Sequence, residues 1–302
     1  MDYKELKQRQ QWTLNQKIDH SLGAIEAFIS LTGRTPFVSY SGGKDSTILL
    51  DLARRYIDKE MKAVFCNTGN EYPEIVRFVR NTENVTIIRP KYTFRQVIEK
   101  YGFPLISKEQ AQGIRQAKTT RSEKLRNIRL HGTDRNRGWV SGKIADRWQY
   151  LIDEPFMVSE KCCECLKKRP LARYVKQSGE VPLIGTMAVE SILRKQQYIR
   201  RGGCNSFNGK NAASYPLSIW TDVDIWNYIR MFNVPYCELY DQGHTRTGCM
   251  VCGFGAQYEI TPNRFERLAS SHPKAYKIFM GYANSGVTYG EALIKTGVKL
   301  PE

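Results

Sequence analysis

The sequence has no long hydrophobic run, and none of its segments approaches the roughly 18 consecutive apolar residues that a membrane-spanning helix requires. It also lacks an apolar stretch near its start, where residues 1–12 are mostly polar and charged, so we expect no secretory leader. Internal repeats and low-complexity tracts are absent as well. These absences exclude membrane-spanning and fibrous classes and predict a cytoplasmic protein with no membrane partner.

Acidic residues are too few to balance the basic ones. Asp and Glu total 30 against 46 Lys and Arg, which gives a formal net charge of +16 over 302 residues. An excess of this size favours an anionic partner, such as a nucleotide, a nucleic acid or an acidic protein, although a merely basic protein is the alternative. Apolar residues at 41% and charged residues at 25% are ordinary values for a globular chain with a sizeable core.

Short apolar runs alternate with helical patterns along most of the chain. The predicted strands are residues 37–40, 63–66, 85–88 and 181–185, and the predicted helices are 3–31, 47–56, 73–79, 93–101 and a segment from about 188. Such alternation predicts an α/β fold with a parallel sheet and helices on both faces. We expect an N-terminal helix at 1–34, an α/β domain at 35–245 and a C-terminal part at 246–302.

Residues 115–147 differ from the rest of the chain because basic residues dominate them. Ten Lys and Arg stand against three acidic residues, a local net charge of about +7. We predict a basic helical insertion with glycine-rich loops at about 110–150. Its cations suit a nucleic-acid backbone, and Trp139 and Trp148 suit stacking on bases, although a solvated helix face and buried tryptophans are the alternatives.

A glycine-rich turn joins the first predicted strand to the helix that follows it. Glycines let an anion approach the backbone, and the free N–H groups of a new helix bind phosphate. The lysine adds a positive charge, the aspartate suits Mg²⁺, and the final serine suits helix capping or phosphate binding. The turn is not a Walker A loop, which has Ser or Thr directly after its lysine. Its residues are Ser41, Gly42, Gly43, Lys44, Asp45 and Ser46.

This turn resembles the PP-loop of the adenine nucleotide α-hydrolase superfamily, whose enzymes cleave ATP between the α and β phosphates. The resemblance implies that Lys44 and Asp45 are catalytic and that the whole turn binds the nucleotide, with Mg²⁺ as cofactor. It also implies a PP-loop fold, with the parallel sheet already predicted. The basic insertion and the cysteine-containing C-terminal part would be additions to that fold.

Further segments resemble the phosphoadenosine phosphosulfate (PAPS) reductase family within this superfamily. Residues 65–74, FCNTGNEYPE, are similar to its second-strand signature, with Asn67 standing where Asp is usual. The resemblance implies that Asn67, Thr68 and Gly69 contact the nucleotide. A looser match over residues 185–194 implies the same for Arg194, and residues 215–243 are similar to the family's late strand, helix and turn.

Five of the eight cysteines fall into two groups, Cys162-Cys163-x-Cys165 and Cys249-x-x-Cys252. Thiolates in this number select zinc or an iron–sulfur cluster, and the spacing alone does not separate the two. Adenosine phosphosulfate (APS) reductases carry adjacent cysteines and a distant Cys-x-x-Cys. That resemblance implies a [4Fe–4S] cluster on Cys162, Cys163, Cys249 and Cys252, with zinc as the alternative metal and Cys165 as the competing ligand.

The chain lacks the thiol that sulfonucleotide reductases use. Those enzymes carry a nucleophilic cysteine near the C-terminus, whereas residues 253–302 contain none, and their PP-loops are usually degraded. We therefore predict an ATP pyrophosphatase that activates a substrate, in the first place a nucleic acid, for sulfur transfer. It resembles the ATP pyrophosphatases of bacterial DNA phosphorothioation, and a cysteine desulfurase or another sulfur donor is an implied partner.

Two other functions fit the same motifs. One is an APS or PAPS reductase, which binds an adenosine phosphosulfate nucleotide in place of ATP. In that case Cys204 is the candidate nucleophile, because Arg200 and Arg201 beside it would lower its pKa. The other is a nucleotide-binding regulator or defence component that does not turn its nucleotide over.

Overall fold

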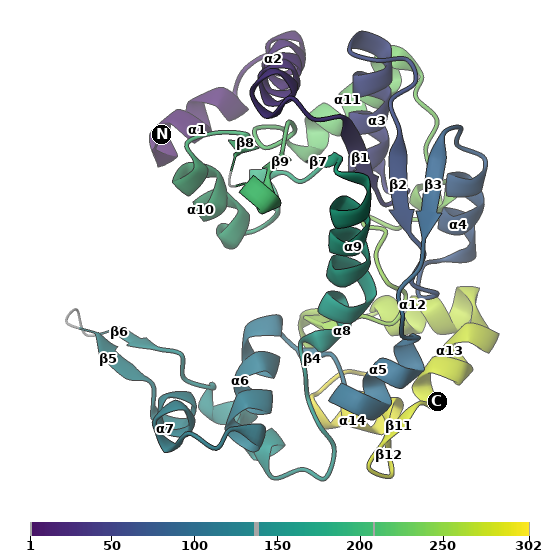
Figure 1. Cartoon of the computed structure of the whole chain (residues 1–302). Helices are drawn as coiled ribbons and strands as arrows, with labels where there is room; N and C mark the ends of the chain where they lie inside the picture. The colour runs from purple at the N-terminus through teal and green to yellow at the C-terminus, as the bar shows by residue number, and fades with distance from the viewer. Residues whose placement is uncertain (1, 136–138, 208, 302) are drawn as a thin grey trace. The chain divides into compact units, whose positions relative to one another are not determined.

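The computed structural model describes residues 2–135, 139–207 and 209–301 (Figure 1). The fold divides into two units, each assembled from separate stretches of chain. The first unit takes the residues up to Asn67, then Glu71–Arg89 and Pro170–Gly248. The second takes Thr68–Asn70, Pro90–Arg169 and the residues from Cys249 onward. The helical residues before position 34 thus belong to the first unit, and nearly all of 246–302 belong to the second.

Within the described residues, six strands form the sheet of the first unit in the order β3-β2-β1-β7-β9-β8. Every pairing is parallel except the last, in which β8 runs antiparallel to β9. The register sets Val38 opposite Ala63 on one side and Leu183 on the other. The strands are β1 (Pro36–Tyr40), β2 (Ala63–Cys66), β3 (Val85–Ile88), β7 (Val181–Ile184), β8 (Asn205–Ser206) and β9 (Ala213–Ser214).

Helices pack on both faces of this sheet because side chains alternate along each strand. Tyr40 of β1 faces α3, where its hydroxyl lies 3.4 Å from that of Thr47. Phe37, on the opposite face, packs edge-on against Tyr174 of α9 at 5.3 Å between ring centroids. The helices are α1 (Tyr3–Gln10), α2 (Leu14–Thr32), α3 (Lys44–Tyr56), α4 (Pro73–Arg80), α9 (Arg169–Ser178), α10 (Ile192–Arg201) and α11 (Asp222–Phe232).

The predicted α/β class with a mainly parallel sheet is confirmed, and strands 63–66 and 85–88 have the predicted bounds. Two helix predictions are corrected. The helix expected over 3–31 is broken, because Thr13 caps a new helix through a reciprocal pair of hydrogen bonds with Gln16. The helix expected from 188 begins at Ile192, after a 3₁₀ turn (Ala188–Glu190) and the N-cap residue Ser191.

The second unit is mostly helical and contains short pairs of strands. Its basic segment includes α6 and α7 as predicted, but β5 and β6 form an antiparallel hairpin where glycine-rich loops were expected. Its helices are α5 (Phe94–Tyr101), α6 (Lys108–Thr119), α7 (Glu123–His131), α8 (Lys161–Cys163), α12 (Arg264–Ser271), α13 (Pro273–Met280) and α14 (Tyr289–Lys295). Its strands are β4 (Leu105–Ile106), β5 (Thr133–Arg135), β6 (Trp139–Ser141), β10 (Gly253–Phe254), β11 (Ala283–Asn284) and β12 (Val287–Thr288).

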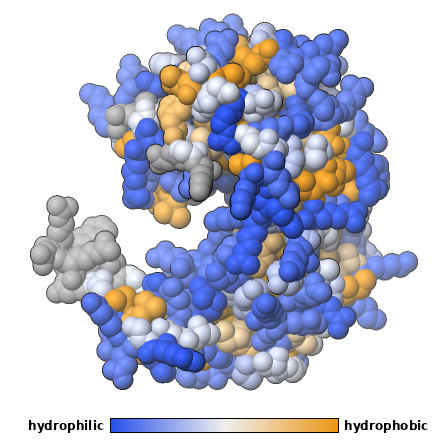
Figure 2. All heavy atoms as spheres, in the orientation of Figure 1, coloured by the Kyte–Doolittle hydropathy of each residue, from blue (hydrophilic) through white to orange (hydrophobic). Residues whose placement is uncertain are grey.

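Among the residues that the structure describes, no helix is both long enough and apolar enough to cross a bilayer. The face drawn in Figure 2 is mostly hydrophilic, in keeping with the mean hydropathy of −0.49. The large apolar side chains are gathered in the interior, where Trp220 and Tyr228 of the first unit and Phe103 and Tyr289 of the second are fully buried.

Candidate functional site

The predicted phosphate-binding turn follows β1, at the point where the strand order of the sheet changes direction. From β1 the chain continues to β2 and β3 on one side, and β7 joins later on the other side. Ligands of open α/β sheets bind beyond the carboxyl ends of the strands at such a switch point. The turn after β7 closes on the same place, since a Cβ on Gly185 would lie 3.0 Å from the carbonyl oxygen of Asp45.

The two glycines of the turn are required by its geometry. Gly42 has φ +72°, and a Cβ there would lie 2.8 Å from a methyl group of Val79. A Cβ on Gly43 would lie 2.5 Å from the hydroxyl oxygen of Thr247. Gly43 is the N-cap of α3 and has no side chain with which to cap that helix. Its first N–H groups are therefore presented at the turn, as an anion site requires.

Serine hydroxyls hold the turn in shape. The Ser46 hydroxyl donates to the Gly43 carbonyl at 3.0 Å and accepts from the Ser41 backbone N–H at 3.1 Å. The Ser41 hydroxyl lies 2.9 Å from the Ser46 hydroxyl and accepts from the Gly43 N–H at 3.3 Å. The structure thus brings all six predicted residues of the turn together, with the two serines bonded to the turn itself.

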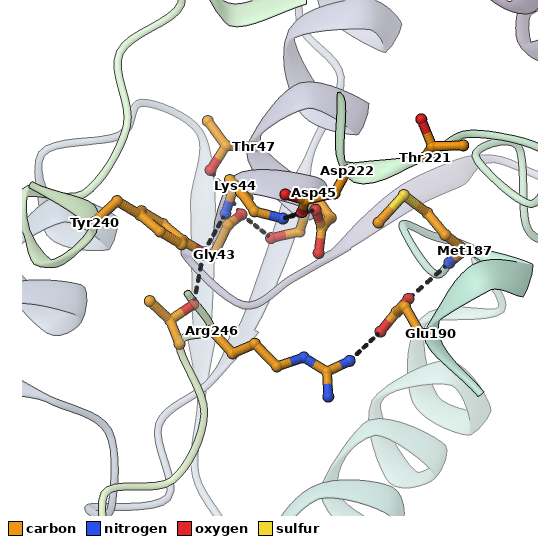
Figure 3. Close-up of polar contacts among 12 residues, drawn as sticks. Gly43, Lys44, Asp45, Thr47, Met187, Glu190, Thr221, Asp222, Tyr240 and Arg246 are labelled. Carbon is orange, nitrogen blue, oxygen red and sulfur yellow. Dashed lines mark hydrogen bonds and ion pairs between the residues drawn. The ribbon is translucent and has the colours of Figure 1, made fainter. Parts of the chain in front are cut away.

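Lys44 is the charged centre of the site, and its side chain is only 5% exposed. Its ammonium group donates to Asp45 at 2.9 Å and to Asp222 at 2.5 Å (Figure 3). Burial alone would lower the pKa of Lys44, but these carboxylates outweigh burial and raise the pKa, so the ammonium stays charged. Burial raises the pKa of Asp45, and the adjacent ammonium opposes that shift.

Three partners of the turn were missed by the sequence predictions. Asp222 opens α11 and is 64% exposed, so its carboxylate reaches Lys44 from the solvent side. The Tyr240 hydroxyl accepts from the Lys44 backbone N–H at 2.9 Å and lies 3.1 Å from the Thr247 hydroxyl. Tyr240 therefore occupies one of the N–H groups that a phosphate would use. Only the match over residues 215–243 indicated that this segment belongs near the turn.

Arg194, a predicted nucleotide contact, forms an ion pair with Glu190 in the same unit. Glu190 also accepts from the Met187 backbone N–H at 2.7 Å and from Arg246 at 3.1 Å (Figure 3). The negative charge of Glu190 acts on Asp45 and contributes to its raised pKa. Glu190, the partner of Arg194, is therefore close enough to the turn to influence Asp45. Glu190 was not among the predicted site residues.

The predicted contacts at the end of β2 are divided between the two units. Asn67 stays with the sheet, where its backbone N–H donates to the Ile88 carbonyl at 2.9 Å. Thr68 and Gly69 belong to the second unit. There the Thr68 hydroxyl accepts from the Asn70 N–H at 3.2 Å, and the Asn70 carbonyl accepts from the Met250 N–H at 2.8 Å.

One short extended segment brings the two cysteine groups of the second unit together. Phe103 bridges to Val158, four residues before Cys162, and its backbone N–H donates to the Met157 carbonyl at 2.8 Å. Strand β4 then pairs in parallel with β10, which begins directly after Cys252. Two glycines allow these approaches. A Cβ on Gly102 would lie 2.0 Å from the Met157 carbonyl oxygen, and one on Gly253 would lie 2.4 Å from that of Pro104.

The four predicted cluster ligands act on one another electrostatically. Burial raises the pKa of Cys162 well above its usual value, and negative charge on Cys249, Cys163 and Cys252 raises it further. Lys167 opposes the shift. Within the described ranges, however, no three His, Cys, Asp or Glu side chains converge closely enough to hold a metal ion as they stand. The thiol side chains would therefore have to move before they could coordinate one metal centre together.

Two residues that the sequence predictions missed hold the second cysteine turn. Arg264 donates to the Cys252 carbonyl at 2.7 Å and is itself paired with Glu259. The hydroxyl of the fully buried Tyr289 donates to the Val251 carbonyl at 2.8 Å. Burial raises the pKa of Tyr289, with charge on Cys252 and Cys162 adding to the shift. Both side chains fix the backbone between the two cysteines.

Cys165 and Cys204 differ from the four cysteines above. Burial raises the pKa of Cys165, and the charges that act on it belong to Arg169, Glu164, Lys161 and Lys100 and to none of the other cysteines. Burial also raises the pKa of Cys204 to about 11, although Arg201 acts in the opposite direction. The expectation that neighbouring arginines make Cys204 reactive is therefore wrong in sign, because burial outweighs their charge.

The basic segment contains two kinds of cation. Five are engaged in the fold: Arg115 with Glu160, Lys118 with the Phe156 carbonyl, Arg129 with Gln116 and the Gly142 carbonyl, Lys143 with Asp146, and Arg147 with Tyr258. Three are exposed, and the described residues give them no hydrogen bond or ion pair: Arg121, Lys124 and Arg126. Arg137 and the side chains of Arg135 and Trp139 lie outside what the structure describes.

The sequence model of the phosphoadenosine phosphosulfate reductase domain matches residues 35–253, and the chain belongs to this family. The chain is also similar to two uncharacterized proteins of Methanocaldococcus jannaschii. One is 23% identical over 92% of this chain and 48% of that protein, and the other is 28% identical over 71% and 40%. The chain thus spans about half the length, or less, of these curated relatives.

Over a shorter stretch the chain is similar to the adenosine 5'-phosphosulfate reductase of Oceanobacillus iheyensis, with 35% identity over 31% of this chain and 37% of that enzyme. Among solved structures it is similar to the PAPS reductase of Candida auris, with 15% identity and a TM-score of 0.42 over 82% of this chain and 96% of that one.

Proposed function

We propose that this chain cleaves ATP between its α and β phosphates and thereby activates a nucleic acid for sulfur transfer. One observation carries the proposal: an undegraded Ser41–Ser46 turn opens α3 at the strand-switch point, with a buried, charged Lys44 beside Asp45. The N-terminal N–H groups of a helix, an ammonium and a carboxylate suited to Mg²⁺ are the groups that a bound triphosphate requires. Membership of the PAPS reductase family supports adenine-nucleotide chemistry.

In the proposed reaction the residues of the turn bind and orient the nucleotide. An acceptor oxygen attacks the α-phosphorus, the bond from that phosphorus to the bridging oxygen breaks, and pyrophosphate leaves with the electron pair. Lys44 and the N–H groups of α3 stabilise the charge that develops on the leaving group. Asp45 would hold Mg²⁺, which neutralises phosphate charge when bound. A sulfur donor, such as a cysteine desulfurase, then displaces AMP from the activated acceptor.

We further propose that Cys162, Cys163, Cys249 and Cys252 hold a [4Fe–4S] cluster, with zinc as the alternative metal. Support comes from the mutual charge effects of these thiols and from the β4 segment that draws their two turns together. Lys167 adds positive charge, which favours deprotonated thiols at the site. When bound, such a cluster supplies a redox-active centre.

The direct test is product analysis on protein purified without oxygen. One reaction contains ATP, Mg²⁺ and candidate DNA or RNA substrates, and its pyrophosphate is measured. A second contains APS or PAPS with thioredoxin, and its sulfite is measured. Pyrophosphate from ATP supports the proposal. Tight nucleotide binding without any product would contradict it and favour a regulator.

The free cations of the basic segment should contribute to nucleic-acid affinity through counterion release. Reversing Lys124 and Arg126 to Glu is expected to flatten the slope of log K against log salt by about 1.4 for single-stranded DNA, since each phosphate contact contributes about 0.7. The measurement is fluorescence anisotropy across a salt series. The matched control reverses Lys274 and Lys277, exposed cations on α13, and should leave the slope unchanged. An unchanged slope in the Lys124 and Arg126 variant would contradict the prediction.

Arg129 is a poor choice for such a test. Its guanidinium donates to Gln116 at 2.8 Å and to the Gly142 carbonyl at 3.0 Å, so it joins α6, α7 and the end of the hairpin. Its reversal would weaken binding through misfolding as well as through charge.

The second candidate function is APS or PAPS reduction, which the similarity to adenosine 5'-phosphosulfate reductases favours. That reaction needs a thiolate that attacks the sulfate sulfur and is afterwards accessible to a reductant. Residues 253–302 hold no cysteine, and the remaining candidate, Cys204, is buried with a pKa of about 11. Both facts support ATP cleavage over reduction for the chain in hand.

We therefore expect no thioredoxin-dependent sulfite from APS or PAPS, and no effect of Cys204→Ser on pyrophosphate release from ATP. Well below a pKa of about 11 the Cys204 thiol is protonated, so it is a weak nucleophile at neutral pH. Sulfite formation by the unmodified chain that disappears in Cys204→Ser would establish the reductase.

A further inference from the structure

Three planar side chains gather on the surface of the second unit. Arg147 and Trp148 lie in the 3₁₀ helix η1 (Asp146–Ile152), and Tyr258 ends the 3₁₀ turn η6 (Ala256–Tyr258). The Arg147 guanidinium carbon lies 5.2 Å from the centroid of the Trp148 ring and 5.6 Å from that of Tyr258. It also donates to the Tyr258 hydroxyl at 2.6 Å. These three residues are called the aromatic platform.

The aromatic platform reaches the surface, although Trp148 is half-buried, and Arg147 contacts both of its rings. Tyr258 is 62% exposed, and Arg147 is exposed as well. An exposed tyrosine held by an arginine contributes little to a core, but it is preorganised for a flat ligand, so little side-chain entropy is lost on binding. Aromatic rings that carry a guanidinium are good stacking partners for nucleobases.

The carboxylates beside the aromatic platform are already paired with other cations. Glu259, next to Tyr258, pairs with Arg264, and Asp146, next to Arg147, pairs with Lys143. No acidic side chain among the described residues forms an ion pair with Arg147. The charge of Arg147 is therefore available to an anionic ligand.

The free cations of the basic segment belong to the same part of the unit. Gln149 of η1 donates to the Leu130 carbonyl at 3.1 Å, which ties η1 to the C-terminal end of α7. Lys124 and Arg126 lie on α7, and Arg121 directly precedes its N-cap, Ser122. Free cations on the helix that η1 contacts, together with an exposed aromatic ring, are the combination that binds single-stranded nucleic acid, because cations meet phosphates and rings meet bases.

We propose that the aromatic platform, with Arg121, Lys124 and Arg126, is a binding surface for single-stranded nucleic acid. Bases stack on Tyr258 and Trp148, and the cations contact the backbone. A duplex keeps its base faces inside the helix, so the surface prefers single strands. The proposal takes its partner from the proposed function, but it does not depend on ATP cleavage.

The test measures the anisotropy of a labelled single-stranded oligonucleotide and of a duplex of equal length, without ATP. Tyr258→Ala is expected to weaken single-strand binding about tenfold, the loss typical of one stacked base. Tyr258→Phe keeps the ring but loses the hydrogen bond from Arg147, so it should retain most of the affinity. Tyr56→Ala, at a tyrosine 45% exposed in the first unit, is the matched control and should have no effect. Tyr258→Leu serves as a second non-planar variant should the alanine variant misfold.

Equal affinity of the unmodified chain and its folded Tyr258→Ala or Tyr258→Leu variant would overturn the proposal, and so would equal affinity for duplex and single strand. Polyglutamate that binds as tightly as the oligonucleotide, with the same loss in Tyr258→Ala, would assign the surface to acidic proteins and would also overturn it. Because the assay contains no ATP, its outcome is independent of pyrophosphate release.

Discussion

Replacing Lys44 with alanine is expected to slow pyrophosphate release from ATP by roughly 10²–10³, the usual loss when a preorganised charge at a transition state is removed. Lys44 is buried at the start of α3, and the carboxylates around it raise its pKa and keep it charged. Charge stabilisation is strong in such a desolvated place, so water does not replace the lost ammonium efficiently. The measurement is steady-state pyrophosphate release at saturating ATP.

Asp45→Ala is expected to have an effect of similar size, because it removes the carboxylate that would hold Mg²⁺. The control is Lys59→Ala, which removes an exposed lysine beyond the C-terminal end of α3. Thermal unfolding of each variant separates lost chemistry from lost fold. Unchanged turnover in folded Lys44→Ala and Asp45→Ala proteins would refute the assignment of the turn as the phosphate site.

Cys249→Ser and Cys252→Ser are each expected to abolish iron binding and the brown colour of protein purified without oxygen. A cluster with four thiolate ligands loses stability when one soft ligand becomes a hydroxyl. The two turns would then lose the link that the cluster provides between them, so we also expect a lower thermal unfolding temperature. Iron, zinc and acid-labile sulfide are measured by elemental and colorimetric analysis.

Cys165→Ala is the matched control for the cluster. None of the other cysteines is among the charges that act on its thiol, so iron content should be retained. Loss of iron in Cys165→Ala with retention in Cys163→Ala would exchange the roles of these two residues. Stoichiometric zinc without iron in the unmodified protein would replace the cluster with a zinc site.

The alternation of strands and helices was visible in the sequence because it is a local property. Strands 63–66 and 85–88 are short apolar runs bounded by polar turns, and the glycine turn at 41–46 marks a strand-to-helix junction by composition alone. The break at residues 11–13 was also local, since Thr13 and Gln16 spell a capping box. The hairpin of β5 and β6 was hidden because its strands have only three residues each and no apolar alternation marks them.

By itself, the sequence determined the residue types of the glycine-rich turn, the parallel α/β class and the two cysteine groups. Only the tertiary structure decided their partners, because those contacts join residues far apart in the chain. Lys44 meets Asp222 and Tyr240 across 178 and 196 residues, and no local pattern encodes such a pairing. The fold likewise decides which arginines have partners. Packing places the Gln116 side chain and the Gly142 carbonyl against Arg129, whereas the described residues give Arg126 no hydrogen bond or ion pair.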